Sequence, residues 1–195
     1  LERGVPLAGV LGLAHRDGEG IAAGSPRPLC QDLDGLAFPA RELLHDAGRY
    51  LPPPAMYRRQ PVAVMLTSRG CNRRCIFCFQ LDKERRSGVR YRSVENVIEE
   101  IELCLRQGYR EIKFIDDTFA QDRARALRLA REIRRRGLEF TWFASACVNQ
   151  VDPELLRAFR EAGCWAILFG VESGVQKNLN TLKKGITLAQ ARRAV

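Results

Sequence analysis

The chain has 195 residues, 46% of them hydrophobic and 28% charged, so it can form one domain with a substantial buried core, or one domain and a fragment of another. No apolar run approaches the roughly 18 residues that cross a bilayer, so we expect no membrane span. No basic-then-apolar leader is seen, and the seven cysteines are typical of reduced thiols. We therefore expect a cytoplasmic protein without a disulfide framework. The formal net charge of +9 raises the question of nucleic-acid binding, but no aromatic residues are interleaved with the arginines as a stacking surface requires, and nucleic acid is not expected as a partner.

The first 60 residues differ in character from the rest of the chain. Short apolar runs on either side of RDGEG (16–20) predict two strands joined as a hairpin. The stretch from 31 to 60 is rich in proline and lacks sustained periodicity, which is typical of a connector. We therefore predict a domain remnant at 1–30 and a linker at 31–60.

From Pro61 onward, strands and helices are predicted to alternate. Four apolar runs predict strands at 62–68, 111–115, 139–146 and 164–170. Three helices are expected between them: one capped by Ser93 and ending at Gly108, one at 122–136 ending at Gly137, and one capped by Asp152 and ending at Gly163. The arginines of the second helix are expected to form a solvated basic face, and Thr187 is expected to begin a fourth helix.

This alternation predicts an α/β fold with a parallel sheet and right-handed crossovers, either a barrel or a doubly wound sheet. In both architectures the binding and catalytic residues gather at the carboxyl ends of the strands. Unusual residues at the predicted strand ends are therefore the candidates for function.

Three cysteines, Cys71, Cys75 and Cys78, follow the first strand with the spacing CxxxCxxC. A structural zinc site would use four tetrahedral ligands, often as two separated pairs, but no second pair is present and both histidines, His15 and His45, lie in the front segments. A purely structural role is also disfavoured for three thiols clustered in a polar loop. Three thiolates from one tight loop can instead hold three irons of a 4Fe-4S cluster and leave the fourth iron open, and an open metal position is typical of a catalytic site.

The stretch CNRRCIFC resembles the CxxxCx-aromatic-C signature of the radical S-adenosylmethionine (radical SAM) superfamily. The resemblance implies an enzyme in which SAM chelates the fourth iron and is reductively cleaved to a 5′-deoxyadenosyl radical, which abstracts hydrogen from a substrate. It implies that Cys71, Cys75 and Cys78 are the cluster ligands and catalytic residues, and that Phe77 lies along the adenine, where a flat apolar ring can pack a base. It also implies an external electron donor of the flavodoxin or ferredoxin type, and a partial (β/α) barrel with about four of the usual six βα units.

Two further strand ends match the family. FIDDTF (114–119) carries Asp116 and Asp117, where the family binds the amino end of SAM; the alternative is a solvated turn that caps the next helix. FGVESG resembles the family's GxESG motif, which implies that Glu172 and Ser173 face the ribose or the methionine part of SAM and that Gly170 allows close approach of the backbone. The alternative for this motif is a plain glycine turn.

Two positions fit the family less directly. Cys147 stands at the end of the third strand, where relatives often carry an arginine before the NxVDPELL pattern, and this puts a contribution from that strand in doubt. In LKKGIT (182–187), which also looks like the family, Lys183 and Lys184 are expected to face solvent.

The front segment resembles the junction between a cobalamin-binding domain and the radical SAM core in the cobalamin-type subgroup. This resemblance implies that 1–30 is the tail of such a domain, that 61–195 is a core truncated at its carboxyl end, and that any cobalamin would be bound by a missing N-terminal domain. The histidine motif that ligates cobalamin in the family is not visible. We therefore expect the sequence to be a fragment, and we predict that this stretch alone is poorly soluble or inactive.

Three functions compete on this evidence. A radical SAM enzyme is favoured, with cobalamin-assisted methyl transfer and ring-forming oxidation of a small or lipid-like molecule both open. The alternative is a non-enzymatic iron–sulfur electron carrier, which would normally have a fourth cysteine ligand. The third is a zinc-stabilised binding module, which metal analysis would identify.

Overall fold

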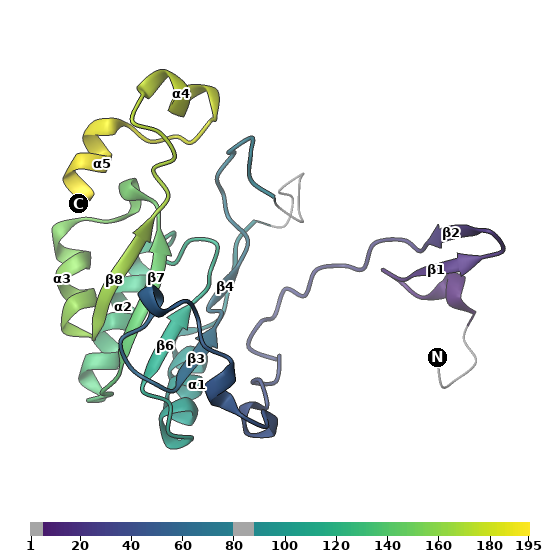
Figure 1. Cartoon of the computed structure of the whole chain (residues 1–195), viewed down its shortest axis with the longest axis horizontal. Helices are drawn as coiled ribbons and strands as arrows, with labels where there is room; N and C mark the ends of the chain where they lie inside the picture. The colour runs from purple at the N-terminus through teal and green to yellow at the C-terminus, as the bar shows by residue number, and fades with distance from the viewer. Residues whose placement is uncertain (1–5, 80–87) are drawn as a thin grey trace. The chain divides into compact units, whose positions relative to one another are not determined.

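A computed structural model describes residues 6–79 and 88–195 (Figure 1). The chain divides into two compact units, Leu1–Gln31 and Asp32–Val195. In the first unit a 3-10 turn, η1 (Leu7–Gly9), precedes strands β1 (Ala14–Asp17) and β2 (Gly20–Ala23), which pair antiparallel, so the predicted hairpin is confirmed. The division into upstream remnant, linker and core stays a prediction, and residues 1–5 of that remnant lie outside the described residues.

The second unit is built on a parallel sheet of four strands. In spatial order these are β3 (Val62–Met65), β6 (Glu111–Phe114), β7 (Thr141–Ala146) and β8 (Cys164–Phe169). The first strand ends earlier than predicted, because Ser68–Arg69 forms a separate strand, β4, that pairs antiparallel with β5 (Arg90–Tyr91). The α/β prediction is confirmed, and the sequential order of the parallel strands fits part of a barrel.

Three helices connect these strands; the first and third begin directly after Ser93 and Asp152 as predicted, and the second begins one residue later than predicted, after Asp122. They are α1 (Val94–Arg106), α2 (Arg123–Arg135) and α3 (Pro153–Glu161). The side chains of Ser93, Asp122 and Asp152 accept the backbone N–H of the residue three positions later, which satisfies a donor left free in the first turn. Past the end of α3, Gly163 has φ of 93°, and a Cβ there would lie 2.3 Å from the Phe140 carbonyl oxygen, so only glycine fits.

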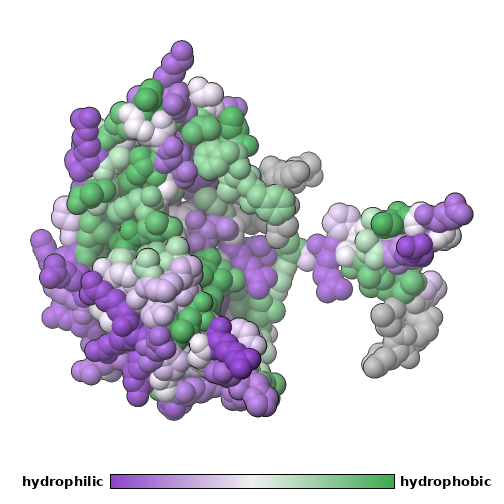
Figure 2. Space-filling model, viewed as in Figure 1, coloured by the Kyte–Doolittle hydropathy of each residue, from purple (hydrophilic) through white to green (hydrophobic). Residues whose placement is uncertain are grey.

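The helices cover one face of the sheet, and the core lies between them. Met65, Phe114 and Trp142 point into this core and are at most 2% exposed. Side chains alternate between the two faces of a strand, and on the opposite face Val64, Ile115 and Leu168 are 41%, 45% and 50% exposed. Figure 2 shows hydrophobic residues gathered over the middle of this unit, above a margin of hydrophilic ones.

The segment at 32–60 packs against the sheet. It contains the 3-10 turns η2 (Arg41–Leu43), η3 (Ala47–Arg49) and η4 (Pro54–Met56). The backbone N–H groups of Arg58 and Arg59 each donate to Glu111 at 2.8 Å, and this buried carboxylate also accepts from Thr141 Oγ1 and Trp165 Nε1. The proline-rich segment therefore belongs to the same compact unit as the sheet.

The last described stretch contains two short helices beyond β8. Helix α5 (Leu188–Ala194) begins after Thr187 as predicted, whereas α4 (Gln176–Thr181) has no counterpart among the predicted elements. Leu179 and Ile186 from this stretch are buried together with Val148 in a small second cluster. Within residues 6–79 and 88–195, no helix has the length and apolar character that a bilayer crossing requires.

Candidate functional site

The loops that follow the four parallel strands leave the sheet at one edge, because parallel strands all end on the same side (Figure 1). The cysteine loop, residues 70–79, lies beyond β3 and the short strand β4. Asp116 and Asp117 follow β6, Cys147 follows β7, and the stretch at 170–175 follows β8. The fold thus brings the predicted site residues to neighbouring strand ends, although they are far apart in the sequence.

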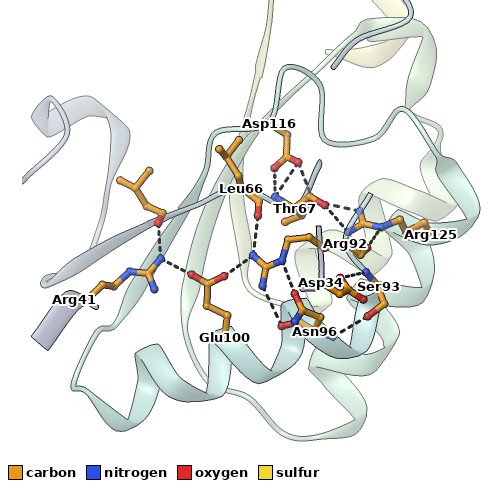
Figure 3. A network of polar contacts seen from close by, with 11 residues as sticks. Asp34, Arg41, Leu66, Thr67, Arg92, Ser93, Asn96, Glu100, Asp116 and Arg125 are labelled. Carbon is orange, nitrogen blue, oxygen red and sulfur yellow. Dashed lines mark hydrogen bonds and ion pairs between the residues drawn. The ribbon is translucent and has the colours of Figure 1, made fainter. Parts of the chain in front are cut away.

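Asp116 fixes the residues that lead into the cysteine loop. It is 3% exposed, and its Oδ1 accepts the Thr67 backbone N–H at 3.1 Å and the Thr67 hydroxyl at 2.9 Å (Figure 3). The same oxygen also accepts the Ser68 hydroxyl. Burial raises the pKa of the Asp116 carboxyl group, although the hydrogen bonds from Ser68 and Thr67 oppose that rise. These protein donors give Asp116 a structural role in the fold. Its role in holding the amino end of SAM stays a prediction.

Two arginines hold the same stretch from the other side. Arg125 of α2 donates to Thr67 Oγ1 at 3.2 Å, to Thr67 O at 3.1 Å and to Arg92 O at 3.0 Å (Figure 3). Arg92 donates to Leu66 O at 2.8 Å and to Glu100. Burial lowers the pKa of the Arg125 guanidinium, which Asp116 partly offsets. Residues 66–68 are therefore held in place by charged groups from three separate elements.

Glu100 of α1 forms ion pairs with Arg92 and with a further arginine, Arg41. It is 1% exposed and lies between Arg92 and Arg41, whose Nη2 is 2.5 Å from Glu100 Oε1 and 2.8 Å from Val64 O. The carbonyl groups of Val64 and Leu66 lie on the outer side of β3, an edge strand of the described sheet. The arginines satisfy backbone acceptors that an edge strand otherwise leaves free.

Glycine and side-chain acceptors shape the start of the cysteine loop. Gly70 has φ of 99°, and a Cβ there would lie 2.8 Å from Gly88 O, so the loop needs glycine where it leaves β4. The Gly70 N–H donates to Asp117 Oδ2 at 3.1 Å, and the Asn72 N–H donates to Gln121 Oε1 at 3.1 Å. Asp117 is exposed, so part of its carboxylate stays available at the strand end.

The three thiols lie on this one loop. Cys71 and Cys75 are half-buried and Cys78 is exposed, and none of them forms a disulfide. Burial raises the pKa of the Cys71 thiol, although the backbone N–H of Arg73, 3.5 Å from the sulfur, lowers it. Phe77, just before Cys78, is 50% exposed.

This donor set fits an iron–sulfur cluster better than a single ion. Among the described residues, no group of three or more His, Cys, Asp or Glu side chains surrounds one ion position. A cluster does not need such convergence, because each thiolate binds a different iron. Three soft sulfur donors on one accessible loop therefore match a cluster held at three of its irons.

The loop after β8 holds an ion pair that the sequence did not predict. Lys184, expected in solvent, is 8% exposed and its Nζ lies 2.9 Å from Glu172 Oε1; its neighbour Lys183 is exposed as predicted. Gly170 makes room for the pair, because a Cβ there would lie 2.4 Å from Glu172 Oε1. Ser173 Oγ accepts the Val175 N–H at 3.1 Å. The assignment of Gly170, Glu172 and Ser173 to SAM stays a prediction.

The end of β7 contributes a short turn rather than a charged group. Cys147 begins η5 (Val148–Gln150), and its N–H donates to Gln150 Oε1 at 2.9 Å. Asn149 Oδ1 accepts from Arg73 Nη2 at 2.5 Å. An arginine thus does reach this strand end, but it comes from the cysteine loop.

The basic residues of α2 bind acidic residues of the flanking helices. Arg128 pairs with Glu95 of α1, Arg131 with Glu154 of α3, and Arg134 with Glu161 of α3. These pairs neutralise much of the helix that carries the densest positive charge. The three arginine side chains are 61% to 66% exposed, so they lie on a solvated face, as predicted, and form ion pairs at the surface.

Comparison with known proteins agrees with this geometry. The family model of the radical SAM superfamily matches residues 65–195. An uncharacterized methyltransferase of Pyrococcus horikoshii is 36% identical over 200 residues, which cover 100% of this chain and 41% of that relative. A cytidylyl-2-hydroxyethylphosphonate methyltransferase of Streptomyces wedmorensis is 33% identical over 180 residues, which cover 85% of this chain and 32% of that relative. The solved structure of OxsB, a cobalamin-dependent S-adenosylmethionine radical enzyme, superposes with a TM-score of 0.77 at 21% identity, covering 97% of this chain and 28% of that one, and so shares the fold.

The chain spans less than half the length of the curated relatives it matches. The family model nevertheless covers the sheet, the cysteine loop and the strand ends described above. The chain therefore belongs to the radical SAM superfamily.

Proposed function

We propose that this chain is the cofactor-binding part of a radical SAM enzyme, in which Cys71, Cys75 and Cys78 hold three irons of a 4Fe-4S cluster. The observation that carries the proposal is the position of three soft donors on one loop beyond the carboxyl end of β3. The residues that lead into this loop are held by the charged side chains of Asp116, Arg92 and Arg125. Family membership supports the same assignment. With SAM bound, such a cluster would supply one-electron cleavage of a carbon–sulfur bond and, through it, abstraction of hydrogen from a substrate.

The chain's own residues would bind and orient the cofactor. Phe77, next to the last cysteine, is 50% exposed and would pack against a base. Glu172, on the loop after β8, would offer a carboxylate oxygen as a hydrogen-bond acceptor, and Gly170 would serve the cofactor by leaving the space in which Glu172 Oε1 and Lys184 Nζ meet. Asp117, exposed at the end of β6, is the available carboxylate for an amino group, whereas Asp116 is surrounded by protein donors.

Methyl transfer to a small molecule is the reaction that we favour. Both relatives named above are described as methyltransferases, and the solved neighbour is described as a cobalamin-dependent enzyme. We propose that the protein also uses cobalamin, bound outside the radical SAM unit, and an electron donor of the flavodoxin or ferredoxin type. Because the proposed ligands are reduced thiols, we place the protein in the cytoplasm.

The test is cluster assembly in single cysteine variants. We expect Cys71→Ala, Cys75→Ala and Cys78→Ala each to lose most of the iron and sulfide bound after anaerobic reconstitution, because each removes one of only three protein ligands. Cys164→Ala, at the amino end of β8, is the matched control and should bind iron as the unmodified protein does. Full cluster content in Cys75→Ala, or zinc without sulfide in the unmodified protein, would show that the ligand assignment is wrong.

Addition of SAM separates the proposed enzyme from an iron–sulfur electron carrier. An open iron binds SAM directly, so the EPR spectrum of the reduced cluster should change when SAM is added. A carrier whose irons all have protein ligands would keep its spectrum unchanged.

A further inference from the structure

Lys184 is a buried cation beside the cysteine loop. The sequence presents it as the second of two adjacent lysines, yet Lys183 is exposed and Lys184 is 8% exposed. A lysine is seldom buried unless it has a partner, because removing its charge from water is costly. Its burial therefore needs an explanation in terms of the groups that it contacts.

Glu172 is the first of these groups. Its Oε1 accepts from Lys184 Nζ at 2.9 Å, and the side chains are 34% and 10% exposed respectively. The Glu172 backbone has φ of 71°, the left-handed region that a glutamate rarely adopts. The strained backbone and the ion pair fix one position of the Glu172 carboxylate, and Gly170 leaves the space that the ion pair needs.

Phe77 is the second group. Lys184 Nζ lies 5.6 Å from the centre of the Phe77 ring, within the range of a cation–π contact. The two loops also meet through the backbone, since the Ile76 N–H donates to Leu182 O at 3.1 Å. Asn149 joins them again, because it accepts from Arg73 Nη2 and donates to Gly185 O at 3.1 Å.

The charge of Lys184 is held beside the loop that carries the thiols, in contact with Phe77 and Glu172. Burial alone would lower the pKa of Lys184, but the hydrogen bond and charge of Glu172 raise it above its ordinary value. The side chain is therefore a permanent cation at neutral pH. It is the kind of charge that stabilises a neighbouring centre after that centre gains an electron.

We propose that Lys184 is a positioning residue of the cofactor site, and that it acts through Glu172 and Phe77 and through its own charge. The inference rests on the proposed function. Because the Glu172 carboxylate and the Phe77 ring are already held in one arrangement, less side-chain conformational entropy is lost when SAM binds. The fixed cation makes the cluster easier to reduce, because it favours the more negative of the two cluster states.

Lys184→Met tests the inference, with Lys183→Met as the matched control one residue away. In the anaerobically reconstituted protein we expect Lys184→Met to keep the normal iron content, to bind labelled SAM about tenfold more weakly in equilibrium dialysis, and to have a more negative midpoint potential in an EPR-monitored titration. Lys183→Met should match the unmodified protein in all three. Lys184→Arg, which keeps the charge, should recover most of the potential and part of the affinity.

A second comparison tests the path of the effect. If Lys184 acts on SAM through Glu172, the variant Lys184→Met with Glu172→Gln should bind SAM no more weakly than the worse of the two single variants. Additive losses would overturn that path.

Two outcomes would overturn the inference while leaving the proposed function intact. One is equal SAM affinity and equal potential in Lys184→Met and Lys183→Met. The other is loss of iron in Lys184→Met alone, which would mean that the lysine serves the fold of the loop. Absence of a cluster from the unmodified protein would instead overturn the proposed function, and the inference with it.

Discussion

Replacing Asp116 with alanine tests whether this carboxylate holds the entrance to the cysteine loop. The change removes the acceptor for the Thr67 N–H and for the hydroxyls of Thr67 and Ser68, all of which are buried. An orphaned buried N–H costs about 1–3 kcal/mol, and the hydroxyls and the nearby Arg125 charge add to that cost. Part of this cost is offset, because the variant no longer has to bury the charged Asp116 carboxylate, whose burial is unfavourable and raises its pKa. We expect a net loss of about 3 kcal/mol in the free energy of unfolding, or about 10 °C in Tm for a unit of this size.

Asp117→Ala is the control, because Asp117 is exposed and its carboxylate accepts from the Gly70 N–H at the surface. It should cost about 1 kcal/mol or less. The assay is denaturant unfolding of the cluster-free protein, followed by iron content and SAM affinity after reconstitution. Equal stability of the two variants would refute the structural role of Asp116. Normal stability with lost SAM affinity in Asp116→Ala would show that it is a cofactor ligand.

Two further changes test the packing of the same unit. Glu100→Gln should lower the free energy of unfolding by about 3–5 kcal/mol, because it leaves Arg41 and Arg92 buried without their carboxylate. Glu102→Gln on the same helix should cost less than about 1 kcal/mol, because its ion pair with Arg136 is partly exposed, and similar losses in the two variants would contradict the network. Asp152 has a pKa of about 2, lowered from 3.8 mainly by the hydrogen bond from Arg123, so the stability that it gives is present above pH 3.8 and is lost as the pH falls toward about 2. The stability difference between the protein and Asp152→Asn should shrink over that window in acid unfolding measurements, and a constant difference would count against this assignment.

The elements that the sequence predicts well are those with local signals. Ser93 and Asp152 cap helices where a polar side chain precedes an apolar periodic run, and Gly163 ends one where the chain must turn sharply. The cysteine spacing is also a local signal, so the sequence alone indicates the candidate cluster loop. Parallel topology then follows from the alternation of strands and helices.

Contacts between distant segments leave no comparable signal. Lys184 resembles its exposed neighbour in sequence, and its burial depends on Glu172 and Phe77, which come from two other loops. Glu111 reads as an ordinary charged residue at a strand start, yet it is buried because the proline-rich segment folds back over it. Buried charges of this kind are determined by tertiary structure, and local propensity says nothing of them.

The central claim is that three thiolates hold a cluster whose fourth iron is open to SAM. The most direct measurement is Mössbauer spectroscopy of the anaerobically reconstituted, iron-57-labelled protein, recorded before and after addition of SAM. The account predicts a 4Fe-4S centre with one iron site whose parameters change when SAM binds. Four irons that do not respond to SAM, or no cluster at all, would contradict it.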